Sequence, residues 1–294
     1  MGAWGAHRLA RRNAEPRPLR RPAVFWLAAG LAGWRLISGL WSAEARLSLA
    51  MALHLALLAG VVLLLANDPP APSALAGWLM VGLSLQAAVA LAEATTQGTL
   101  FLRPLHLPWP GDLDAALSGV SVVETPGGAR WLRAYGTTPH PNILGGLLLL
   151  YLAGPALWLC ENGANRAGLP TARNRLWSGV AYLAWLFGIA ALLLTFSRAA
   201  WLGAAAAALT LAVTLPRPAR KPLLTLALAA LPVALALAVL LRAFLLPRLS
   251  PTPGAGGTRL EQQSAEERGA LNRAGWELWR AHPLTGVGAG AYMV

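Results

Sequence analysis

The apolar residues of this chain fall into long runs that are separated by shorter polar segments. A membrane-spanning helix needs about 20 mostly apolar residues to cross about 30 Å of hydrocarbon. Seven runs come near this length: residues 23–41, 47–66, 74–94, 142–160, 176–196, 199–215 and 222–245. The sixth run is short, and its alanines at 204–208 predict a helix buried among others rather than one exposed to lipid. The pattern predicts an all-α, polytopic membrane protein with about seven transmembrane helices.

Composition supports this interpretation. The chain is 56% hydrophobic and 12% charged, which is typical of a membrane protein and not of a soluble domain. The net charge of +12 does not indicate a nucleic-acid partner, because the arginines lie mainly between the apolar runs. One cysteine, Cys160, provides neither a disulfide framework nor a cysteine-based metal site. We therefore expect no metal, no cofactor and no nucleic acid.

The distribution of basic residues predicts the orientation of the helices. Six arginines precede the first apolar run, and such a cluster is retained on the cytoplasmic side. The N-terminus is then cytoplasmic, and the protein lies in a bacterial inner membrane. The predicted division is a basic cytoplasmic tail (1–22), three transmembrane helices (23–94), an extracytoplasmic loop (95–141), four transmembrane helices (142–245), and the start of a large extracytoplasmic loop with an amphipathic helix (246–294).

Several cations near the predicted outer face need an explanation. Arg198 directly follows an apolar run, where a charge without a partner would cost a few kcal/mol at bilayer depth. It can bind an anion, or its side chain can extend to the headgroup layer. Arg130 and Arg133 precede a helix that begins near Pro141, and a helix N-terminus favours anions. The alternative there is a capped helix start with solvated arginines.

A further polar segment follows the last apolar run. It contains Arg268, and Leu271, Trp276 and Trp279 recur in it at helical spacing. We expect an amphipathic helix on the membrane surface, which ends at Pro283 and a glycine-rich loop.

Three separated strings together resemble one protein family. They are YGTTPHPNILGG (135–146), TFSRAAWLG (195–203) and the stretch from ER to HPLTGVGAG (267–290). Their order and spacing are similar to those of the O-antigen ligase and polymerase superfamily, over residue 100 to the end of the chain. The resemblance implies transfer of a glycan from undecaprenyl diphosphate to an acceptor at the outer face of the cytoplasmic membrane. It implies as partners the lipid-linked donor, a glycan, lipid or protein acceptor, and membrane lipids.

The resemblance also assigns residues. Arg198 matches the Ser-Arg motif of the family and Arg268 the arginine before the outer amphipathic helix, so both are expected to bind the diphosphate, followed by Arg133 and Arg130. The catalytic histidine of the family is expected beyond Val294, and neither His140 nor His282 matches it. The chain is therefore expected to be a C-terminally truncated member, and the resemblance leaves its activity open.

Two other classes of function fit parts of this pattern. A transporter or flippase for an anionic lipid-linked substrate would use the same cations to line a passage. It should show paired charges or broken helices at mid-membrane, where the sequence has only the unpaired Arg35, His54 and Pro232. A non-catalytic membrane scaffold is the third alternative.

Overall fold

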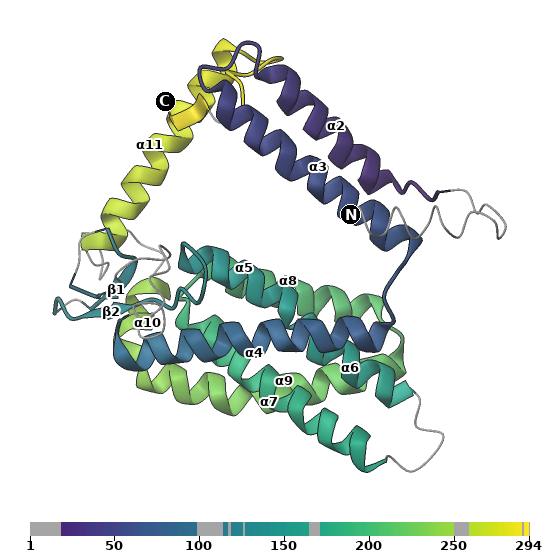
Figure 1. Cartoon of the computed structure of the whole chain (residues 1–294). Coiled ribbons are helices and arrows are strands. Elements are labelled where there is room, and N and C mark those ends of the chain that lie inside the picture. Colours follow the sequence, from purple (N-terminus) through teal and green to yellow (C-terminus); the bar gives the residue numbers. More distant parts are fainter. Residues whose placement is uncertain are drawn as a thin grey trace. The chain divides into compact units, whose positions relative to one another are not determined.

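The computed structural model describes residues 19–98, 114–116, 119–125, 127–164, 171–249, 259–289 and 291–293. The predicted basic tail lies outside these residues except for its last four positions, and so does much of the predicted extracytoplasmic loop. The helices of the described residues are α2 (Ala23–Ser38), α3 (Ala45–Asn67), α4 (Pro72–Thr96), α5 (Pro141–Tyr151), α6 (Ala153–Ala164), α7 (Ala172–Leu194), α8 (Arg198–Thr214), α9 (Arg217–Leu240), α10 (Arg242–Leu249), α11 (Arg259–Ala281) and the short 3₁₀ helix η2 (Ala291–Met293), as Figure 1 shows.

The prediction of an all-α membrane protein is confirmed. Five helical stretches of the described residues are long and apolar enough to cross a membrane: Ala45–Asn67, Pro72–Thr96, Pro141–Glu161, Ala172–Leu194 and Arg220–Leu240. The first and sixth predicted spans are also helices, α2 and α8, but they have only 16 and 17 residues. Large apolar side chains are exposed on the helices, as expected of a surface that contacts hydrocarbon. On α8, for example, Leu202 is 72% exposed and Leu209 is 67% exposed.

The chain forms two compact units. One consists of Met1–Pro70 and Ser264–Val294, and the other of Ala71–Gln263. In the first unit, α2 and α3 pack side by side as a helical hairpin (Figure 1). A loop that follows α11 is attached to this hairpin, because the backbone N–H of Ala289 donates to Ser38 Oγ over 3.2 Å. Both ends of the chain therefore contribute to the first unit.

The second unit is a bundle of α4 to α10 with a main apolar core and smaller apolar clusters beside it. Helix α7 is central to it and contacts α4, α5, α6, α8 and α9. Leu83 of α4, Leu144 and Leu148 of α5, and Ala191 of α7 are fully buried in this core. Small residues on α7 let its neighbours approach closely, which is the usual way in which helices pack in a membrane.

Two details differ from the sequence-based predictions. The alanines of α8 are not buried: residues 205–208 are exposed in the described part of the chain, and Ala200 in the first turn is the buried residue of this helix. Methyl groups offer little area to bury, so the helix is held mainly by its first turns against α5. The predicted outer loop also contains two short strands, β1 (Val122–Glu124) and β2 (Arg130–Leu132), which pair antiparallel with Val123 opposite Trp131.

Candidate functional site

The polar face of α4 holds the segment that carries Arg133. Glu93 is 3% exposed, and its Oε2 accepts the backbone N–H groups of Tyr135 and Gly136, both over 2.8 Å. One turn later, Oε1 of Gln97 accepts the N–H of Leu132 over 2.7 Å. These side chains replace the strand or helix partners that an irregular buried backbone otherwise lacks. Residues 132–136 are therefore fixed against α4.

Arg133 lies at the centre of this arrangement and is only 6% exposed. Its Nε donates to the backbone carbonyl of Thr195 over 2.8 Å, and its Nη2 donates to Oδ1 of Asn142 over 2.7 Å. The guanidinium thus connects the end of α7 with the first turn of α5. These two hydrogen bonds fix the orientation of the guanidinium.

The TFSR turn between α7 and α8 is built from unusual local geometry. Phe196 is fully buried with a φ of 48°, a left-handed conformation that a bulky residue rarely adopts. Thr195 Oγ1 accepts the N–H of Ser197 over 3.2 Å. Ser197 caps α8, because its Oγ accepts the N–H of Ala200 over 3.4 Å. Arg198 is the first residue of α8 and is half-buried. Strained turns of this kind concentrate at functional sites.

The N-terminal turns of α5 and α8 lie close together. A Cβ added to Gly145 would lie 2.7 Å from the Cβ of Ala200, so only a glycine allows this approach. Arg133 contacts the first turn of α5, and Arg198 begins α8. Two positive helix ends and two arginines are therefore gathered in one region of the second unit, which favours a negatively charged ligand.

His140 closes the start of α5. Its Nδ1 accepts the N–H of Asn142 over 3.1 Å, and its Nε2 lies 3.2 Å from Ser121 Oγ. Burial lowers the pKa of His140 from its ordinary value, and the charge of Arg133 lowers it further. A neutral ring with its proton on Nε2 satisfies both contacts. His140 is therefore a helix cap in this geometry and not a free base.

The other two predicted arginines have their own contacts. Arg130 begins β2, opposite Glu124 on β1, and its Nη1 donates to the carbonyl of Ala116 over 3.3 Å. It belongs to the same unit as Arg133 and Arg198. Arg268 is exposed on α11, where its Nη2 donates to Ser264 Oγ over 2.8 Å. Arg268 belongs to the first unit, so its participation in one site with the other three arginines stays a prediction.

Comparison with known families gives one match. Residues 182–293 match the O-antigen ligase family model, a segment that runs from within α7 to η2. This part of the chain is therefore similar to O-antigen ligases. No curated protein and no solved structure matches the chain. The matched segment contains Arg198 and Arg268, whereas Arg130 and Arg133 precede it.

Some residues of this candidate site are not among those predicted from the sequence. Glu93 and Gln97 are the most important of them, because they position the segment around Arg133. A carboxyl group within an otherwise apolar span is a recognisable signal, since such residues are costly in a membrane and usually have a polar partner. The identity of that partner, 42 residues further along the chain, has no local signal.

Proposed function

We propose that this chain transfers a glycan from undecaprenyl diphosphate to an acceptor hydroxyl at the outer face of a bacterial cytoplasmic membrane. The similarity of residues 182–293 to O-antigen ligases supports glycan transfer in general. The lipid diphosphate is the finer part of the proposal, and Arg133 and Arg198 are its proposed ligands in the second unit. Arg268 and Arg130 are proposed to assist in binding the same group.

The buried guanidinium of Arg133 is the observation that carries the proposal. A diphosphate ester leaves with increasing negative charge, so fixed cations stabilise the transition state more than the bound donor. Arg133 is already oriented by Thr195 and Asn142, and it therefore needs little reorganisation when charge develops. The adjacent starts of α5 and α8 add their dipoles to this charge.

The proposed reaction is a single displacement at the anomeric carbon. The acceptor oxygen forms a bond to this carbon while the bond to the diphosphate oxygen breaks, and the lipid diphosphate leaves with the electron pair. The configuration of the sugar inverts. The hydroxyl proton of the acceptor passes to a base, a role for which His140 does not fit because both of its ring nitrogens are occupied.

Arginine variants test this assignment in cells. Arg198→Ala and Arg133→Lys should each reduce glycan transfer about 100-fold or more, because the first removes a cation and the second removes the planar fork that Thr195 and Asn142 orient. The matched control is Arg175→Ala, which removes an exposed arginine from the opposite end of α7. Surface polysaccharide is measured on gels, and membrane insertion is checked by fractionation.

The position of the stalled donor distinguishes transfer from transport. If the chain is a transferase, the Arg198→Ala cells accumulate lipid-linked glycan on the outer leaflet, where an added lectin labels it in spheroplasts. If the chain moves the donor across the membrane, the glycan accumulates on the cytoplasmic side and stays unlabelled. Normal polysaccharide from the Arg198→Ala chain would refute the site.

The proposed orientation has its own test. An alkaline phosphatase fused after Gly128, between β1 and β2, should be active because this turn is proposed to lie outside the cytoplasm. A fusion after Pro216, at the start of α9, should be inactive. The reverse result would place the arginines on the cytoplasmic face and would exclude an acceptor at the outer one.

A further inference from the structure

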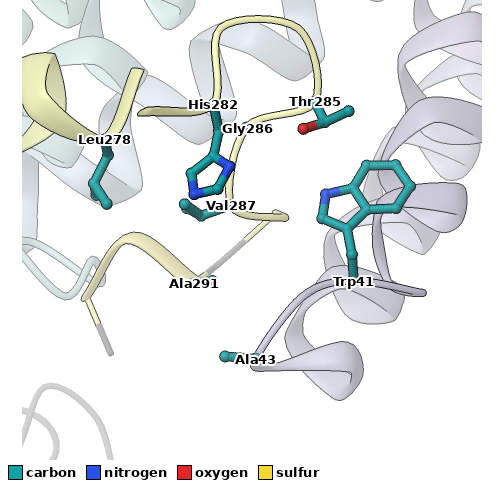
Figure 2. Close-up of a pocket in the computed structure, with 8 residues that line it drawn as sticks. All are labelled: Trp41, Ala43, Leu278, His282, Thr285, Gly286, Val287 and Ala291. Carbon is teal, nitrogen blue, oxygen red and sulfur yellow. The ribbon is translucent and has the colours of Figure 1, made fainter. Parts of the chain in front are cut away.

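The first unit contains a pocket of its own. It has a volume of about 680 Å³, which is within the range of about 300–1,000 Å³ that is usual for small-molecule sites. Trp41, in the turn between α2 and α3, forms one wall (Figure 2). The opposite wall comes from the end of α11 and the following loop, with Leu278, His282, Thr285 and Val287.

The loop that forms this wall is firmly held by the hairpin of α2 and α3. The N–H of Ala289 donates to Ser38 Oγ over 3.2 Å, and the carbonyl of Ala289 accepts from Ser48 Oγ over 2.5 Å. Ser38 is 2% exposed and Ser48 is fully buried. A Cβ added to Gly288 would overlap the Cβ of Ser42, so the loop backbone lies directly on the hairpin. The pocket is therefore a preformed feature of the unit.

The aromatic wall is also preorganised. The ring of Trp41 packs edge-to-face against Trp34, with centroids 5.9 Å apart at 65°. The indole nitrogen of Trp41 is turned toward the loop, and the imidazole of His282 lies across the pocket from the indole (Figure 2). The hydroxyl of Thr285 lies on the same loop, and both His282 and Thr285 are exposed to solvent. An apolar face and several polar groups thus meet in a pocket that is open to water.

This chemistry selects the ligand class. Among the eight described lining residues there is no carboxylate, guanidinium or ammonium group, so the pocket does not suit a diphosphate. An isoprenoid chain would favour a dry channel without solvated polar groups. A sugar ring has an apolar face of C–H groups that can pack on an indole, and hydroxyls at its edge that can bind an indole N–H, an imidazole and a hydroxyl.

We propose that the pocket between Trp41 and His282 binds an uncharged sugar residue of the glycan. The proposal rests on the proposed function, because it assigns the sugar part of the substrate to the first unit and the diphosphate to the arginines. Trp41 provides the stacking surface, and Thr285 and His282 are hydrogen-bonding partners of the hydroxyls. The HPLTGVGAG string follows the amphipathic helix, and this proposal assigns glycan binding to it.

The test measures binding of a glycan that has no lipid and no diphosphate. The probe is the neutral oligosaccharide that mild acid releases from the lipid-linked glycan of the host, and farnesol is the competing apolar probe. Saturation-transfer NMR is recorded on the full chain in nanodiscs. We expect the oligosaccharide to bind, and we expect Trp41→Ala and Thr285→Val to weaken its binding at least tenfold and threefold.

A matched control separates loss of the site from loss of the fold. Trp26→Ala removes another exposed tryptophan, which lies on α2, packs against Phe25 and does not line the pocket, and this variant should bind the oligosaccharide as the wild type does. The more conservative Thr285→Val keeps the test valid if Trp41→Ala does not fold. Unchanged oligosaccharide binding in both pocket variants overturns the proposal. Binding of farnesol alone, or of neither probe at 10 mM, also overturns it.

The result is independent of the arginine site. Arg133→Lys should bind the free oligosaccharide normally, because the probe has no diphosphate. If the arginine variants transfer glycan normally while Trp41→Ala still loses the oligosaccharide, the proposed diphosphate site is wrong and the sugar site stands. If the arginine variants lose transfer while the pocket variants bind normally, the sugar site is wrong.

Discussion

The hydrogen bonds of Glu93 can be tested by replacing this residue with alanine. Glu93→Ala leaves the buried N–H groups of Tyr135 and Gly136 without their described acceptor. An unsatisfied buried donor costs about 1–3 kcal/mol, so two of them should lower the free energy of unfolding by about 2–6 kcal/mol. Glu93→Gln retains a side-chain oxygen that can accept both N–H groups. Its free energy of unfolding should therefore decrease by less than half as much as that of Glu93→Ala.

A control on the same face of α4 limits the interpretation. Gln86 accepts the N–H of Thr137 over 3.0 Å, but Thr137 is exposed and can bind water instead. Gln86→Ala should therefore cost clearly less than Glu93→Ala, about 1 kcal/mol. The difference in free energy of unfolding between the two alanine variants separates the effect of leaving buried donors unsatisfied from the effect of losing a polar side chain.

The assay is reversible unfolding in mixed micelles with an increasing fraction of SDS, followed by tryptophan fluorescence. Glycan transfer is measured in parallel, because release of residues 132–136 should also displace Arg133 and reduce transfer. A free energy of unfolding of Glu93→Ala within about 0.5 kcal/mol of the wild type would refute this role of Glu93. Equal instability of Glu93→Gln and Glu93→Ala would also refute it, since the number of acceptors would then not determine the loss of stability.

Two further predictions concern His140 and the C-terminal loop. The pKa of His140 is lowered in the fold from its ordinary value of 6.5. The contribution of His140 to stability is therefore fully present above pH 6.5. This contribution falls as the pH decreases through 6.5, because the unfolded chain takes up the proton first. In His140→Asn, the thermal unfolding temperature should depend less on pH between pH 7.5 and 5. An unchanged slope of unfolding temperature against pH would contradict this prediction. Gly288 has a φ of 96° and lies against Ser42, whereas Gly286 has a φ of 63° and open space around its Cβ position. Gly288→Ala should therefore cost about 2–5 kcal/mol and Gly286→Ala about 1–2, and equal losses in SDS unfolding would show that the contact with Ser42 is unimportant.

The helices were predictable because each depends mainly on the local length of an apolar run. All seven predicted runs are helical, although the first and sixth are shorter than a typical span. The break at Leu152 between α5 and α6 was not predicted, since the run of apolar residues continues through it. The exposure of the alanines in α8 was also not predictable, because a small side chain permits close packing but does not require it.

The site depended more on contacts between distant segments. The segment before Pro141 and the turn before Arg198 have recognisable motifs, and the structure joins them through the bond from Arg133 to Thr195, which are 62 positions apart. The bond from Ala289 to Ser38 spans 251 positions, and a serine at a helix end has no feature that identifies so distant a partner. Such pairs are decided by packing of the whole chain and not by local pattern.

Two sets of contacts organise the segment around Arg133. The buried carboxyl group of Glu93 accepts the backbone N–H groups of Tyr135 and Gly136. The guanidinium of Arg133 donates to the oxygens of Thr195 and Asn142. The polypeptide is therefore fixed by one set of contacts and the orientation of the guanidinium by another. A site of this design predicts that the positioning residue Glu93 affects stability and transfer together, whereas Arg198, at the half-buried start of α8, affects mainly transfer.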